Sequence, residues 1–160
     1  MSNALEHPVL CRFEVVGFEP APKGSWTPTR NTRTGKLGVR PSCQRTKPYG
    51  HLLRIAARDA WGLQQPLAFA VGVVVTFVVS RPEDHYRTSR GRRTREVKAS
   101  RLGLEPIVEP DLDKLQRAVG DALSKVVIVD DAQITGWIPT KRYVGSHEQP
   151  GTYIAVHGIG

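Results

Sequence analysis

Two short acidic segments hold the residues of this 160-residue chain whose types and spacing best suit catalysis. Asp111 and Asp113 stand two positions apart before an apolar helical pattern, so in an extended entry to a helix their carboxylates point to one side while Leu112 turns inward. Two carboxylates aimed at one point repel each other unless a cation lies between them. Asp130 and Asp131 form the second segment.

The spacing of the two segments is compatible with one acidic site. A helix over residues 112–125 advances ~21 Å at 1.5 Å per residue. An extended, antiparallel return over residues 126–131 covers up to ~20 Å and brings the second pair beside the first. Carboxylates without histidine or cysteine suit Mg²⁺ or Mn²⁺ rather than zinc. Such ions activate water and neutralise the charge that develops on a phosphodiester under attack.

Each acidic segment also has a purely structural explanation. Asp111 or Asp113 alone caps a helix, a common role of Asp that contributes ~1 kcal/mol. An isolated Asp-Asp pair forms a turn between strands. Asp121 lies two helical turns after Asp113, and we assign it a structural or supporting role. The presence of both acidic pairs on an otherwise cationic chain favours the metal site.

The charge of the chain is distributed unevenly. The net charge is +8, but residues 1–101 carry 18 basic and 7 acidic side chains, whereas residues 102–160 carry 5 and 8. A basic body favours a nucleic-acid partner, because each bound cation displaces counterions from the phosphate backbone. We expect DNA to be bound by Arg92, Arg93, Arg95 and Lys98. Four aromatic side chains either stack on exposed bases or pack within the protein: Trp26, Tyr49, Tyr86 and Trp137.

Composition excludes several classes of protein. With 39% hydrophobic and 24% charged residues, the chain is typical of a globular protein rather than a collagen, a disordered chain or a coiled coil. Its longest apolar run, residues 67–79, is shorter than the ~20 residues of a membrane-spanning helix. The N-terminus lacks a basic start followed by an apolar stretch, so we expect no secretory signal and a cytoplasmic location. Cys11 and Cys43 are only two and lie far apart in the sequence, so we expect reduced thiols rather than a disulfide framework or a zinc site.

Apolar periodicity predicts the elements that position the acidic residues. Strands are expected at 11–19 and 67–80, the second central and covered on both faces. Helices are expected at 50–62, ended by Gly62, and at 112–125. Short strands follow within 126–129, 132–138, 141–145 and 152–157, separated by the acidic pair, Pro139 and the turn near Gly151. The order predicts a mixed α/β (α+β) fold, one domain over residues 1–160, with a mixed sheet and two main helices.

Two basic segments interrupt these elements. Residues 22–49 contain seven Lys or Arg and no acid, with Pro, Gly, Ser and Thr throughout, and are predicted to form a loop or an irregular hairpin. Residues 81–101 contain eight Lys or Arg and three acids with almost nothing apolar. That composition predicts a solvated, mobile loop when nothing is bound.

Residues 110–134, PDLDKLQRAVGDALSKVVIVDDAQI, closely resemble the core signature of the RusA family of Holliday junction resolvases. The shared elements, in order, are D-L-D, L-Q, D-A-L and D-D-A-Q. Members of that family are small homodimeric, Mg²⁺-dependent endonucleases common in bacteria and their prophages. The resemblance therefore implies a RusA-like fold, a homodimer, and branched DNA as the substrate.

The resemblance also implies roles for individual residues. In the family the metal is held by acids that correspond to Asp111, Asp113 and Asp131, with Asp130 adjacent. The family's archetype has a catalytically important Lys where this chain has Arg117, on the same helix face as Asp113. Arg binds phosphate as a fork and does not donate a proton. Lys114 is the candidate substitute for the lysine.

Together these observations predict a metal-dependent, structure-selective endodeoxyribonuclease that resolves four-way junctions in DNA recombination and repair. A junction has approximate two-fold symmetry and needs paired cuts, which suits a C2 homodimer. One alternative is a non-catalytic DNA-binding phage recombination factor that keeps the acids for structure. Another is a nuclease for a different branched or single-stranded DNA.

Overall fold

A four-stranded mixed sheet forms the base of the fold in a computed structural model that describes residues 7–24 and 26–159. Across the sheet the strands run in the order β1 (Val9–Val16), β8 (Gly151–Gly158), β4 (Val71–Val79) and β7 (Ile134–Tyr143). β8 is antiparallel to both β1 and β4, whereas β4 and β7 are parallel. The predicted mixed α+β class and the interior position of the Val-rich strand are confirmed.

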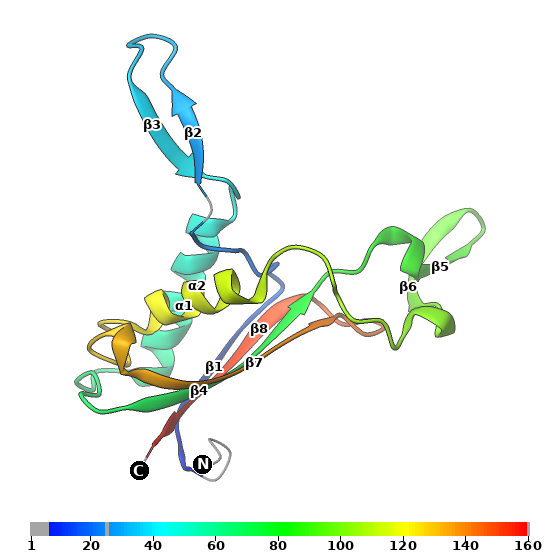
Figure 1. Ribbon diagram of the computed structural model, residues 1–160. Helices are drawn as coiled ribbons and strands as arrows, with labels where there is room; N and C mark the ends of the chain where they lie inside the picture. The colour runs from blue at the N-terminus through cyan, green and yellow to red at the C-terminus, as the bar shows by residue number, and fades with distance from the viewer. Residues whose placement is uncertain (1–6, 25, 160) are drawn as a thin grey trace.

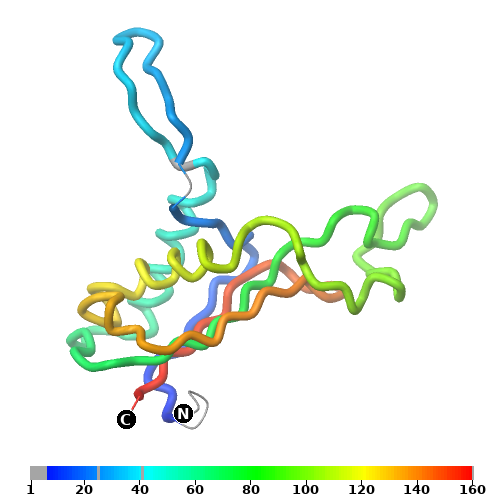
Figure 2. The backbone as a smooth tube through the Cα atoms, in the orientation of Figure 1, coloured from blue at the N-terminus to red at the C-terminus, as the bar shows by residue number. Residues whose placement is uncertain are grey.

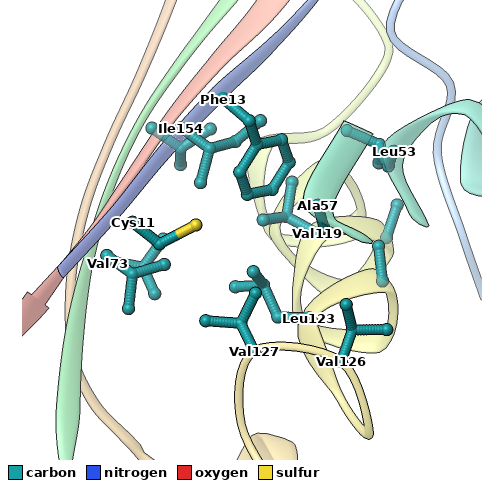
Figure 3. Packing of buried hydrophobic residues seen from close by; sticks show 14 of the residues in the cluster. Cys11, Phe13, Leu53, Ala57, Val73, Val119, Leu123, Val126, Val127 and Ile154 are labelled. Atoms are coloured by element: carbon teal, nitrogen blue, oxygen red, sulfur yellow. The ribbon is translucent and has the colours of Figure 1, made fainter. Parts of the chain in front are cut away.

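Both helices, α1 (Thr46–Trp61) and α2 (Leu112–Leu123), cover the same face of this sheet (Figure 1). Parallel neighbours such as β4 and β7 need a long crossover connection, and α2 lies within that connection. Side chains that alternate along the strands meet the buried stripes of the helices, as Figure 3 shows for Phe13, Val73 and Ile154 facing Leu53 and Val119. The core thus fixes α2 against the sheet.

The first helix begins four residues earlier than predicted, at Thr46 rather than Gly50. Pro48 lies in its first turn, where a missing N–H costs no helical hydrogen bond. The helix ends as predicted at Gly62, whose φ of 70° suits glycine and whose N–H bonds the Arg58 carbonyl. Residues 46–49, the last four of the predicted 22–49 loop, are therefore helical.

The central strand is covered on both faces only in part, which departs from the prediction. Val71, Val73, Val75 and Phe77 point toward the helices and are fully buried. On the opposite face Val78 is fully buried, but Val74 and Thr76 are only half-buried. The continuous apolar run therefore overstated how completely the middle of β4 is covered.

Two further strand predictions were wrong. Pro139 does not separate two strands but lies inside β7, opposite Val75. β7 is an edge strand, where proline is tolerated because its missing N–H can face outward. Residues 126–129 form a turn rather than a strand; Val126, Val127 and Ile128 are buried, and Ile128 makes isolated bridges with Leu67 and Ser124.

The two basic segments form separate hairpins that project from the body in different directions (Figure 1). β2 (Trp26–Arg30) pairs with β3 (Leu37–Pro41), which confirms the hairpin alternative for that segment. β5 (Tyr86–Ser89) pairs with β6 (Arg92–Val97), between the short helices η2 (Glu83–His85) and η3 (Ala99–Arg101). The prediction that residues 81–101 form a loop was therefore wrong, whereas most of these residues are exposed to solvent, as predicted.

In each hairpin segment, one side chain joins the two ends at the base of the hairpin. Thr46 Oγ1 donates to the Pro22 carbonyl at 2.8 Å and so joins the two ends of the β2–β3 hairpin segment. Arg81 is 8% exposed, and its guanidinium donates to the carbonyls of Val144 (2.6 Å), Arg101 (2.7 Å) and Leu102 (3.3 Å). The same guanidinium lies 5.0 Å from the centre of the Tyr143 ring. These bonds give the second hairpin the anchor that its composition did not reveal.

The ends of the described chain lie together, because β1 and β8 pair along their lengths (Figure 2). In the described residues no helix is long and apolar enough to cross a membrane. Both cysteines are free thiols, as predicted. The prediction that the chain lacks a secretory signal concerns residues 1–6 in part, and these lie outside the described residues.

Candidate active site

A cleft of about 370 Å³ opens between the base of the β2–β3 hairpin and the N-terminal end of α2. Asp111 and Lys114 line one side of it, and Cys43 and Arg45, which precede α1, line the other. The first turns of both helices therefore border the same space, and their partial positive charge favours anions there. Asp111, the first residue of the D-L-D triplet, therefore lines this cleft.

Asp111 occupies the N-cap position of α2, but its side chain makes no capping hydrogen bond. The carboxylate instead pairs with Lys114 Nζ at 2.8 Å. The hydrogen bond and charge of Lys114 hold the pKa of Asp111 below its usual value, with a further contribution from the charge of Lys141. The same pair raises the pKa of Lys114. The ionised carboxylate that Lys114 favours is the form that binds a divalent cation.

Lys141 is a residue of this region that the sequence reasoning missed. It lies on β7, and its Nζ donates to the carbonyls of Val108 at 2.7 Å and Pro110 at 3.0 Å. These bonds hold the segment that delivers Asp111 against the sheet. Alternation along β7 places Lys141 on the helix-covered face with Trp137, and a lysine at such an inward position was the available signal.

Asp113 begins a stripe along α2 that also contains Arg117 and Gly120, because residues four and seven apart share one helix face. Asp131 lies at the far end of this stripe. A Cβ built on Gly120 would be 3.7 Å from Asp131 Cβ. Arg117 lies between the two carboxylates in sequence, and its guanidinium packs so closely on Gly24 that a Cβ there would clash with it.

The D-D-A-Q element has a local structural role as well. Asp130 caps the short helix η4 (Asp131–Gln133), since its Oδ1 accepts from Ala132 N–H at 3.0 Å and Gln133 Oε1 accepts from the Asp130 N–H at 2.8 Å. Gln133 Nε2 donates to the carbonyls of Leu67 and Phe69, both at 2.9 Å. Gln133 thus ties η4 to the start of β4, a role that its place in the motif alone did not disclose.

The structure brings together only part of the predicted acidic set. Because residues 126–129 turn instead of extending, Asp131 meets α2 about two helical turns after Asp113. Over the described ranges, no three His, Cys, Asp or Glu side chains form a group that could hold a metal ion. The exposed carboxylates still provide the hard oxygen donors that Mg²⁺ prefers. Coordination by Asp111, Asp113 and Asp131, with Asp130 adjacent, stays a prediction.

Asp121 has the structural role expected of it. Its carboxylate pairs with Lys23, and its carbonyl accepts from Arg54 at 2.7 Å. Lys23 N–H in turn donates to the Lys114 carbonyl at 3.1 Å. These contacts join the base of the β2–β3 hairpin to both helices.

The four predicted DNA-binding cations lie on or next to β6. Arg93 stacks 5.0 Å from the centre of the Tyr86 ring and lies 3.6 Å from Glu83 Oε1. Lys98 Nζ donates to the Asp84 carbonyl at 2.7 Å. Arg92 and Arg95 are exposed, and neither side chain has a hydrogen-bond or ion-pair partner among the described residues. Two of the four therefore serve the hairpin, and two remain available for phosphates.

Comparison with known families gives one result. A model of the endodeoxyribonuclease RusA family matches residues 19–157, which begin shortly after β1 and end one residue before the end of β8. No curated protein matches the chain significantly.

Proposed function

This chain belongs to the RusA family of endodeoxyribonucleases, and from that membership we propose that it is a divalent-metal-dependent nuclease that resolves four-way DNA junctions. The observation that carries the proposal is the position of the D-L-D triplet. Asp111 lines an open cleft at the start of α2 and pairs with Lys114, and Asp113 shares a helix face with Gly120, which lies beside Asp131.

The proposed metal ligands are Asp111, Asp113 and Asp131, with Asp130 next to them. A divalent cation held there, Mg²⁺ or Mn²⁺, would lower the pKa of a bound water and would neutralise charge on the attacked phosphate. The chain's own contribution is to hold the carboxylates. Lys114 pairs with the Asp111 carboxylate and Lys141 bonds the preceding carbonyl of Pro110, while the cap by Asp130 and the bonds from Gln133 hold η4.

Cations around the cleft are proposed to bind the scissile phosphate. Arg117 takes the position of the family's lysine and presents a planar fork of donors. Lys114 lies one turn earlier and provides a compact charge that can also transfer a proton. Either group stabilises the negative charge that develops in the transition state.

The remaining features of the proposal follow from the substrate. Arg92 and Arg95 on the β5–β6 hairpin contact phosphates of a junction arm, with Arg93 and Lys98 beside them. A C2 homodimer places two clefts on the two symmetric strands of a junction. We assign the protein to recombination and repair of DNA in the cytoplasm, in a bacterial or prophage setting.

Junction cleavage tests the function directly. The wild type with Mg²⁺ is expected to nick a synthetic four-way junction and to leave linear duplex intact. Asp113→Asn keeps the size of the side chain, should still bind the junction, and should lose cleavage by at least two orders of magnitude. Asp59→Asn, on the exposed side of α1, is the matched control and should cut like the wild type.

Two outcomes would replace this proposal. Tight junction binding without any cleavage by the wild type, with either Mg²⁺ or Mn²⁺, would indicate a non-catalytic recombination factor. Faster cleavage of a flap or a single strand than of the junction would assign the same site to another DNA structure. Cleavage by Asp113→Asn at the wild-type rate contradicts the assigned metal ligands.

A further inference from the structure

The β2–β3 hairpin has one apolar face that nothing in the described structure covers. Residues opposite each other in a ribbon lie on one side of it, as do alternate residues along each strand. The pairs Pro28 with Val39 and Arg30 with Leu37 therefore share a face with Trp26. Leu37 is 83% exposed, Val39 66% and Trp26 55%. The opposite face carries Thr27, Thr29 and Arg40.

The rim and tip of this hairpin are cationic. From Gly24 to Gln44 the sequence contains Arg30, Arg33, Lys36 and Arg40 and no acidic residue. The tip is ordered by Asn31, whose side-chain oxygen accepts from the N–H groups of Arg33 and Thr34 at 2.9 and 3.0 Å. An apolar surface framed only by positive charge is complementary to a polyanion that also offers flat apolar groups. A nucleic acid with unstacked bases has this chemistry.

The hairpin rises directly from the rim of the candidate active site. Pro22 and Ser42, at its two ends, line the cleft that holds Asp111 and Lys114. On its other side Trp26 borders a second cavity of about 330 Å³, lined also by Lys23, Lys47 and Arg54. DNA bound at Asp111 therefore passes the base of the hairpin. Trp26 lies at that base, because it is the first residue of β2.

We propose that the β2–β3 hairpin is a branch-point arm: Trp26, Leu37 and Val39 pack against bases unstacked at the junction centre, while Arg30, Arg33 and Lys36 bind the adjoining phosphates. The two strands of five residues reach ~16 Å from the body at about 3.3 Å per residue. That reach spans several base steps. The inference rests on the proposed function for the choice of branched DNA.

A second copy of this chain is the competing occupant of the apolar face. Two such hairpins would bring together two sets of cations without a single acid between them, so the contact opposes its own charge. DNA removes that repulsion. Charge complementarity therefore selects nucleic acid over self-association.

Binding of the full-length protein to a junction tests the arm, with Ca²⁺ replacing Mg²⁺ to prevent cleavage. 2-Aminopurine is placed either at the branch point or in the middle of an arm. Wild-type protein is expected to change the fluorescence of the branch-point probe only. Trp26→Ala should abolish that change and weaken junction binding by about 5- to 150-fold, the range for loss of one aromatic stack. Trp26→Phe, which keeps a ring, should retain most of both.

Val39→Thr makes the apolar face more polar while keeping a β-branched side chain, and Val16→Thr makes the same change at an exposed position of β1. Only the first should weaken junction binding. Wild-type affinity in both Trp26→Ala and Val39→Thr, or a branch-point probe that stays silent, overturns the proposal. Conversion of a dimer to a monomer by Val39→Thr, measured by light scattering, also overturns it and assigns the face to a second copy.

The arm and the nuclease function fail separately. Normal cleavage by the wild type with a silent branch-point probe removes the arm and leaves the nuclease. A branch-point signal without cleavage in Mg²⁺ removes the nuclease and leaves the arm. Far-UV circular dichroism of each variant confirms that the fold is retained.

Discussion

Replacing Lys141 with Met tests how the D-L-D triplet is held in place. The substitution keeps most of the side-chain volume and removes the ammonium group that bonds the carbonyls of Val108 and Pro110. Hydrogen bonds to charged groups contribute ~1.5–3 kcal/mol in mutational series. Lys141 is half-buried, so water replaces part of that interaction, and we expect a net loss of ~1–2 kcal/mol in positioning.

This loss should appear as a slower cleavage step. At 1.36 kcal/mol per tenfold, it corresponds to a rate lower by about 5- to 30-fold. Single-turnover cleavage at saturating protein measures that step without a contribution from DNA affinity. The Mg²⁺ concentration for half-maximal rate should also rise, because Asp111 is held less firmly once the bonds from Lys141 to the carbonyls of Val108 and Pro110 are lost. Hydrogen exchange of residues 105–112 should become faster.

Two variants separate positioning from general destabilisation. Lys141→Arg keeps a cationic donor and should recover most of the rate. Lys125→Met makes the same chemical change at an exposed lysine beyond the other end of α2 and should have no effect. If Lys141→Met cuts at the wild-type rate with the wild-type Mg²⁺ dependence, the reasoning about this lysine is refuted.

Three further predictions concern pH, the α2–η4 contact and the core. The bond and charge of Arg142, with the Gly145 N–H, lower the pKa of Glu148, so its contribution to stability is present above the unfolded-state pKa and is lost as pH falls through the folded one. Glu148→Gln should therefore lower the free energy of unfolding by ~1 kcal/mol at pH 7 and by almost nothing at pH 2.5, measured by urea titration; an equal loss at both pH values contradicts this. Gly120→Ala should keep or raise the melting temperature, since its Cβ meets only ordinary contacts, whereas Gly120→Leu should displace Asp131 and reduce cleavage more than tenfold; equal activity of the two variants argues against a role for that contact. Leu123→Ala should cost ~2–5 kcal/mol of unfolding free energy, because the side chain is fully buried against the sheet, and a loss below 1 kcal/mol would show that the helix packs loosely.

The sequence predicted most of what depends on local periodicity. The stripe of Leu115, Val119 and Leu123 correctly indicated α2, and the Val-rich run correctly indicated an interior strand. Both follow from burial of one repeated side-chain pattern. The D-L-D triplet was correctly expected at the entry to a helix, while its ion pair with Lys114 replaced the side-chain cap that the structural alternative allowed.

What the sequence could not supply depends on contacts between distant segments. The β5–β6 hairpin has almost no apolar residues, and it is anchored by Arg81 through carbonyls 20 and 63 positions away. Residues 126–129 have strand composition but form a turn that buries Val126, Val127 and Ile128, so Asp131 lies beside Gly120 rather than beside Asp113. Lys141 reaches Pro110 only because β7 returns beside β4. A local sequence pattern does not reveal contacts between residues so far apart in the chain.

The closure of each hairpin at its base has an evolutionary consequence. Thr46 joins the two ends of the β2–β3 hairpin segment, and Arg81 joins those of the β5–β6 segment. Each hairpin is therefore attached to the body at two fixed points. Lengthening a loop between fixed ends costs only ~0.6 kcal/mol per doubling. Either hairpin can therefore be exchanged, extended or shortened by recombination between related genes without disturbing the sheet. The body of the fold and the two hairpins can therefore change length and sequence largely independently of each other.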